Sequence, residues 1–188
     1  MVKYLNQICI QGKACSTPKT IRSNNCKEDY SFFIDVKRPN SDEVDRLKII
    51  YSSEVCDNID IVEDEWYRIE GRIGNGHVVA TNIIKIPIEF QEKEWKENYI
   101  TLNKSVVRGV VINKSQSRIT KLGKRILKFK ISTNDVIIAC VVLDEDAIKA
   151  NYEIKIGSVV NFEGRFESSN SNKGKYHVSV IKYYTVEL

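Results

Sequence analysis

The sequence contains an internal repeat, and this feature limits the possible folds of the chain more than any other. Five residues of the first half recur 97 positions later: Leu5, Asn6, Gly12, Phe32 and Ile34 return as Leu102, Asn103, Gly109, Phe129 and Ile131. The Glu-Gly-Arg triplet at 70–72 returns at 163–165, which is 93 positions later. Self-similarity at a nearly fixed offset is the signature of a duplicated structural unit. Because 188 residues suffice for two such units, we expect a first domain at 1–88, a linker at 89–101 and a second domain at 102–188.

Both halves show the same order of expected strands. Short runs rich in Ile, Val and aromatic residues, bounded by Gly, Asn, Asp or Pro, are typical of β-strands. They fall at 7–13, 30–36, 47–51, 66–73 and 78–86, and again at 106–112, 126–133, 136–143, 158–166 and 176–186, with a helix expected at 144–154. This order predicts an all-β fold class, namely two tandem OB-fold barrels, each a five-stranded Greek key with room for a short helix between strands three and four.

The composition fits a globular protein and gives little direct evidence of a partner. Hydrophobic residues make up 42% of the chain and charged residues 29%, and the formal net charge of +4 is too small by itself to predict a polyanionic partner. No stretch is apolar enough to span a membrane or to form a signal peptide. We therefore expect an intracellular protein without a membrane partner.

The cysteines predict neither a disulfide framework nor a metal site. They are odd in number, widely spaced and form no C-x-x-C pair: Cys9, Cys15, Cys26, Cys56 and Cys140. We expect reduced thiols and no bound metal.

The sequence also lacks the motifs of common enzymes. It has no Walker loop, no H-E-x-x-H, no G-x-S-x-G and no deaminase signature. His77 and His177 fall at corresponding places, at the start of the last expected strand of each copy, which a duplicated barrel explains better than catalysis does. The adjacent acids at 63–65 point in different directions and favour a solvated corner over a metal site. We expect a protein without enzymatic activity, catalytic residues or cofactors.

Alternation along the second expected strand separates core from surface in each copy. One face is apolar and should lie in the core; it carries Phe32, Ile34 and Val36 in the first copy and Phe129 and Ile131 in the second. The other face carries Phe33, Asp35 and Lys37 in the first copy, and Lys128, Lys130 and Ser132 in the second. Gly12 and Gly109 end a first strand that must bend sharply, so we expect a structural role for both glycines.

An ordered series of short motifs carries a resemblance to a known family. The second copy reads Asn103-x-x-Val106-Val107-x-Gly109, Thr120-x-x-Gly123, Phe129-x-Ile131, Cys140-Val141-Val142 and Gly157-Ser158-x-Val160 before Glu163-Gly164-Arg165. The first copy adds Phe32-x-Ile34-x-Val36-x-Arg38-Pro39. In this order the motifs resemble the bacterial single-stranded DNA-binding protein family across nearly the whole repeat.

The resemblance implies a function and an assembly. We expect non-catalytic, sequence-tolerant binding of single-stranded DNA in replication, recombination or repair, by a cytoplasmic, nucleoid-associated protein. Members of that family typically assemble four OB domains, so the partners expected are single-stranded DNA and a second copy of the chain, a dimer giving four barrels. The family's acidic C-terminal tail has no counterpart before Leu188, so no tail-mediated partner is expected.

Candidate contacts follow from exposed aromatics and clustered basic residues. Sequence-tolerant binders of single strands combine basic grooves with stacking aromatics. Tyr51 stands where the resembled family places a stacking aromatic on the third strand, and Leu143 holds the matching place in the second copy. If Tyr51 faces outward, however, Lys48 must point into the barrel core, which is costly. The candidate nucleic-acid-binding residues are Phe33, Lys37, Arg38, Lys48, Tyr51, Arg118, Lys121, Lys124, Arg125, Lys128, Lys130, Lys173, Lys175 and Tyr176.

Two other functions stay open on this reasoning. A protein-interaction or assembly module would bury Phe33, Ile49 and Tyr51 in a dimer and would have negligible affinity for DNA. A binder of single-stranded RNA would differ only in its ligand, and competition between DNA and RNA would distinguish it.

Overall fold

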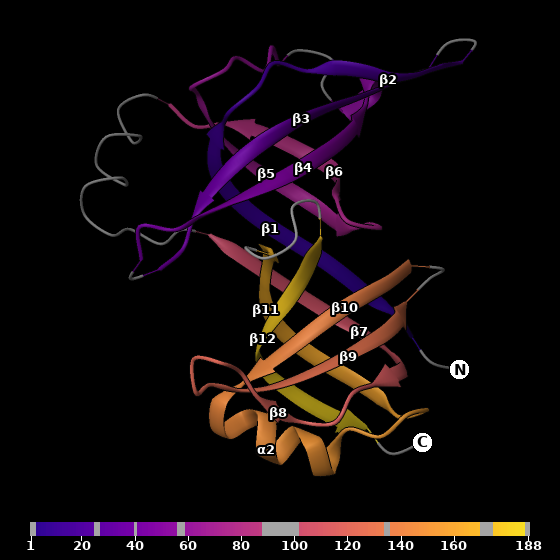
Figure 1. Ribbon diagram of the computed structural model, residues 1–188. Coiled ribbons are helices and arrows are strands. Elements are labelled where there is room, and N and C mark those ends of the chain that lie inside the picture. Colours follow the sequence, from indigo (N-terminus) through magenta and orange to yellow (C-terminus); the bar gives the residue numbers. More distant parts are fainter. Residues whose placement is uncertain are drawn as a thin grey trace. The chain divides into compact units, whose positions relative to one another are not determined.

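A computed structural model describes residues 3–24, 27–39, 41–55, 59–87, 102–133, 136–169 and 175–186 (Figure 1). The chain divides into two compact units, one of residues 8–103 and one of residues 1–7 with 104–188. The expected linker at 89–101 lies outside the described residues, so the domain limits stay a prediction. Within the described parts, no helix has both the length and the hydropathy that a membrane crossing requires.

The first unit is a closed five-stranded barrel. Its strands are β1 (Leu5–Ala14), β3 (Lys27–Lys37), β4 (Val44–Ser52), β5 (Trp66–Ile73) and β6 (Val78–Lys85). Pairing runs from β1 to β3, β4, β6 and β5 and back to β1, and every pair is antiparallel except the parallel pair β4–β6. Outside this ring, β2 (Lys19–Asn24) pairs with β3, and a 3-10 turn η1 (Ser53–Val55) follows β4.

The second unit repeats this architecture. Its ring consists of β7 (Asn103–Lys114), β9 (Arg125–Thr133), β10 (Val136–Leu143), β11 (Val159–Ser168) and β12 (Tyr176–Val186). The same five pairings close it, again with one parallel pair, β10–β12. The short strand β8 (Arg118–Ile119) pairs with β9, and helix α2 (Asp144–Glu153) joins β10 to β11. The prediction of two all-β OB-fold barrels is confirmed, and the expected helix at 144–154 is present.

The core positions predicted from alternation are confirmed. Phe32, Ile34 and Val36 are at most 1% exposed, and the rings of Phe32 and Tyr67 meet edge to face at 6.4 Å in the first barrel. Phe129 and Ile131 are at most 2% exposed in the second barrel. Each fully buried side chain of this size contributes about 1.5–3 kcal/mol to folding. The inward faces of β3 and β9 therefore form part of the cores of the two barrels.

Gly12 and Gly109 lie where the first strand of each barrel passes close to the second. In the first barrel, Lys13 pairs with residues of both β3 and β5, so β1 bends to serve two neighbours. A Cβ atom on Gly12 would lie 2.3 Å from the backbone oxygen of Asp35, and one on Gly109 would lie 2.5 Å from that of Ser132. Neither strand has room for a side chain, so the structural role expected for both glycines is confirmed.

Gly109→Ala should therefore destabilise the second barrel, and Gly12→Ala the first. The added methyl group must displace a strand backbone, and overpacking of this kind costs about 1–3 kcal/mol. Hydrogen exchange with mass spectrometry reports on each barrel separately. We expect faster exchange in β7 and β9 for Gly109→Ala and in β1 and β3 for Gly12→Ala, while the other barrel keeps its protection. Unchanged exchange in both variants would contradict the close approach.

Candidate functional site

The second barrel carries a groove of about 490 Å³ on the outer side of β9 and β10 and along the β11–β12 hairpin. Strand β9 contributes Ile126, Lys128 and Lys130 to its lining. Strand β10 contributes Ala139, Val141 and Leu143, and the hairpin contributes Lys175, Tyr176 and His177. Four residues that the sequence predicted as contacts thus come together in one groove: Lys128, Lys130, Lys175 and Tyr176.

The lysines point into the groove because successive side chains of β9 alternate between the core and the outer face. Leu127, Phe129 and Ile131 fill the core, so Lys128 and Lys130 between them must point outward. Lys175 is exposed at the start of the β12 side of the hairpin. Among the described residues, none of the three lysines forms an ion pair with a carboxylate. The groove therefore presents three ammonium groups to a ligand.

Tyr176 provides an aromatic wall in the same groove. Its ring is stacked on that of Phe166, with centroids 5.5 Å apart and 19° between the ring planes. Burial raises the pKa of the Tyr176 hydroxyl, so the ring stays neutral beside the lysines at physiological pH. A rigid, neutral aromatic ring next to ammonium groups suits a ligand that has both flat rings and negative charges.

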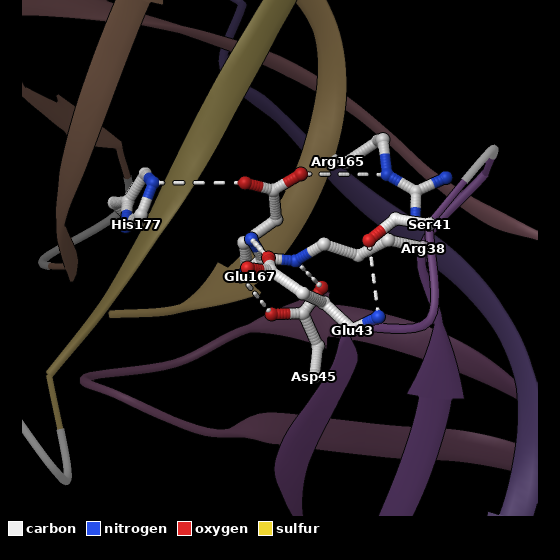
Figure 2. Close-up of polar contacts among 7 residues, drawn as sticks. All are labelled: Arg38, Ser41, Glu43, Asp45, Arg165, Glu167 and His177. Atoms are coloured by element: carbon white, nitrogen blue, oxygen red, sulfur yellow. Dashed lines mark hydrogen bonds and ion pairs between the residues drawn. The ribbon is translucent and has the colours of Figure 1, made fainter. Parts of the chain in front are cut away.

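Glu167 is the acidic residue among the lining residues of this groove, and it lies beside Arg165 and His177 (Figure 2). One carboxylate oxygen lies 3.4 Å from Nε of Arg165, and the other lies 3.8 Å from Nε2 of His177. Only 15% of the Glu167 side chain is exposed. Its charge is therefore compensated locally and opposes an anionic ligand less than a free carboxylate would.

The outer face of the first barrel carries less positive charge than the groove of the second barrel and is formed by different residue types. Phe33 is 37% exposed and lies directly across the strand pair from Lys48, which is half-buried and faces outward. Next to this pair, Arg46 donates two hydrogen bonds of 2.8 Å to the carboxylate of Asp35. Lys37 is half-buried at the end of β3. This face thus offers an aromatic platform, Phe33, beside one lysine. The charges of the neighbouring Asp35 and Arg46 already neutralise each other.

The prediction that Tyr51 faces outward is wrong. Tyr51 is only 6% exposed, and its ring packs on Tyr30 at 5.5 Å and on Phe32 at 5.9 Å. Ile49 is fully buried on the same face, and Lys48 takes the outward position on the opposite one. The costly burial of Lys48 is thereby avoided, and Tyr51 is a core residue.

The pairing of Tyr51 with Leu143 in the two copies is also wrong, by one residue. Phe32 pairs with Ile49, and the equivalent Phe129 pairs with Cys140. The counterpart of Tyr51 is consequently Val142, which is buried too, while Leu143 points into the groove. A shift of one residue along a strand exchanges its inward and outward faces.

Arg38 is held by two acidic side chains of its own barrel. Its guanidinium donates to both carboxylate oxygens of Asp45, at 2.9 and 2.7 Å, and lies 2.6 Å from Glu43 (Figure 2). Asp45 is completely buried and faces inward on β4. A buried carboxylate requires such a partner, so Arg38 has a structural role, and its contact with nucleic acid stays a prediction.

A second basic cluster surrounds the turn between β8 and β9. It consists of Arg118, Lys121, Lys124 and Arg125, of which the first three are exposed and Arg125 is half-exposed. The turn is well fixed, because Thr120 makes hydrogen bonds to Gly123 and Lys124. Lys173, the last predicted contact, lies outside the described residues. No grouping of three metal-binding side chains occurs in the parts of the chain that the structure describes.

Sequence reasoning missed several lining residues of the groove. Ile126, Ala139 and Val141 provide its apolar floor, and Ser179 lies beside His177 on β12. Alternation along β9 could have predicted Ile126, because residues 126, 128 and 130 lie on the same face of the strand.

Asp35→Asn should make Cys15 more reactive. The Cys15 thiol donates to Asp35 at 3.3 Å, and burial together with the Asp35 charge raises the pKa of this thiol to about 11. Removing the carboxylate leaves Arg46 nearby and therefore lowers the pKa of the Cys15 thiol. Each decrease of this pKa by one gives roughly tenfold more thiolate at pH 8. Alkylation by iodoacetamide, followed by peptide mass spectrometry, measures the rate. Cys9 in the same sample is the internal control, and an unchanged ratio of the two rates would contradict the assignment.

Comparisons with known proteins show the fold. No known family and no curated protein matches the sequence. Among solved structures, the chain is similar to the wild-type single-stranded DNA-binding protein from Thermus aquaticus, with a TM-score of 0.78 and 14% identity over 100% of this chain and 95% of that chain. A deletion mutant of the same Thermus aquaticus protein gives a TM-score of 0.78 and 14% identity, over 100% of this chain and 97% of the other. The similarity extends over both barrels and establishes the OB-fold architecture.

Proposed function

We propose that this protein binds single-stranded DNA, without catalysis and with little sequence preference, and that the groove of the second barrel is its main contact surface. The observation that carries the proposal is the convergence of Lys128, Lys130 and Lys175 with Tyr176 in one groove. Ammonium groups neutralise phosphates and displace their counterions, and an aromatic ring stacks on any base. A single strand offers both groups at every nucleotide.

The position of the groove on the barrel supports the same ligand. OB-folds commonly bind oligonucleotides on the face of their second and third strands, which are β9 and β10 here. The solved structures of similar fold belong to a protein described as single-stranded DNA-binding. We extend the proposal to a role in replication, recombination or repair, and to an oligomer in which two chains provide four barrels.

The first barrel contributes less to binding in this proposal. Its Phe33–Lys48 pair offers one stacking ring and one charge, and the adjacent Asp35–Arg46 pair is self-neutralised. Single-stranded RNA carries the same phosphates and similar bases, so competition between DNA and RNA of equal length decides between the two ligands.

A protein-interaction module is less well supported. That function required Phe33, Ile49 and Tyr51 to lie in a dimer interface. Ile49 and Tyr51 are instead buried in the core of their own barrel, which leaves Phe33 as the only exposed member of that set.

The double substitution Lys128→Ala and Lys130→Ala should weaken binding and flatten its dependence on salt. The measurement is titration of a fluorescent oligo(dT) of about 35 nucleotides, a length that several OB sites share, at low and raised salt. The slope of log affinity against log salt should fall by about 0.7 for each phosphate that the variant no longer neutralises. Lys155→Ala is the matched control, because Lys155 is exposed after α2 and lies outside the groove lining. The proposed function fails if the wild-type protein shows no binding at low salt.

Tyr176→Ala should reduce affinity by about 1–3 kcal/mol, the range measured for removing one base-stacking aromatic. Tyr176→Phe keeps the ring and its stack on Phe166, so this variant should bind nearly as well as the wild type. Circular dichroism confirms that both variants are folded. Equal loss of affinity in the two variants would assign the effect to the hydroxyl group and would contradict stacking.

A further inference from the structure

We infer that the β8–β9 hairpin is a wedge for the junction between single- and double-stranded DNA, with Leu122 at its tip placed against the terminal base pair. This inference rests on the proposed function, because it extends the single-strand groove into a second contact. The hairpin consists of β8, the turn 120–124 and the start of β9 (Figure 1).

The hairpin has a fixed shape. Arg118 pairs with Ile126, and Ile119 pairs with Arg125. The backbone of Thr120 donates to the oxygen of Lys124 at 2.8 Å, and its side-chain oxygen accepts from the Lys124 amide at 3.2 Å. Gly123 has a φ of +77°, which closes the turn in a conformation that other residues rarely adopt. The turn is therefore closed by its own hydrogen bonds, with Leu122 at its tip.

The tip is apolar, which is unusual at a turn. Leu122 is 88% exposed, and Ile119 at the base of the turn is 61% exposed. Turn positions normally favour Gly, Pro, Asn, Asp or Ser. Covering Leu122 would remove apolar surface from water, so contact between the tip and an apolar face of a partner is favourable in free energy.

The charge around the tip selects a polyanion as that partner. Arg118, Lys121, Lys124 and Arg125 surround Leu122, and none of them forms an ion pair with any described residue. Phosphates account for the basic residues and the face of a base pair accounts for the leucine. Proteins that bend or open DNA insert apolar side chains between base steps in this way.

The hairpin continues the proposed single-strand groove. Because Arg118 pairs with Ile126, its side chain lies on the same face of the strands as Ile126, Lys128 and Lys130. A strand held along β9 therefore meets Arg118 and then the tip. On the other border, the exposed acids at 144–146 begin α2 directly after Leu143, the strand partner of Ile126. Their charge repels phosphates and leaves the groove side as the approach for DNA.

The test compares three fluorescent ligands: a single strand, a blunt duplex and the same duplex with a single-stranded tail. The wild-type protein should bind the tailed duplex about tenfold more tightly than the single strand, the scale set by burying one leucine side chain. Leu122→Ser should lose this preference and keep its affinity for the single strand. Ile156→Ser is the matched control, since Ile156 is 65% exposed and lies outside the hairpin. A 2-aminopurine base in the terminal pair should brighten with the wild-type protein and not with Leu122→Ser.

Different failures have different meanings. Normal binding of the single strand without preference for the tailed duplex would overturn the wedge and leave the proposed function intact. Absence of single-strand binding at low salt would overturn both. A change in sedimentation between wild type and Leu122→Ser without DNA would assign the tip to contact between copies of the chain and would also overturn the wedge.

Discussion

Closure of each barrel depends on a first strand that pairs with two neighbours at once. Strand β1 serves β3 near its end and β5 along most of its length, and β7 serves β9 and β11 in the same way. This double pairing forces the strand to bend against its neighbour's backbone, at Gly12 and at Gly109. Once the ring is closed, each strand turns one face to the core, and on β9 the opposite face, with Lys128 and Lys130, is exposed. The candidate site is the solvent face of the second and third strands.

The same scaffold presents two different chemistries. In the first barrel, the cross-strand pairs are Phe33 with Lys48 and Asp35 with Arg46. In the second, the equivalent pairs are Lys130 with Ala139 and Ser132 with Ile137. Opposite charges across one strand pair satisfy each other, whereas an alanine opposite a lysine offers that lysine no charge partner. For this reason the proposed function places the main contact with the polyanion on the second barrel.

The sequence predicted the fold and the core well, because these depend on local alternation and on the repeat. Phe32 and Phe129 fall on a period of two with their neighbours, and the repeat doubles that evidence. The phase of the third strand was harder, because its apolar residues fill both faces: Ile50 is half-buried outside and Ile49 is buried inside. The family position of Tyr51 favoured the wrong phase, although the argument that Lys48 resists burial pointed to the right one. Other features depended on contacts between distant residues and could not be predicted. The role of Arg38 follows from Asp45, an acid at an inward position of β4 that no periodic pattern would place there.

Duplication explains how the outer face could change while the fold did not. Inward positions are tied to one another by packing, so a change there costs stability in either copy. Outward positions have few such ties: Phe33 in one copy stands where Lys130 stands in the other, and neither substitution disturbs the core. A barrel of this kind can therefore exchange stacking for charge at single positions. With three lysines and one aromatic wall, the second barrel presents more charge than the first, and in the proposed function its binding free energy should come mainly from the release of counterions.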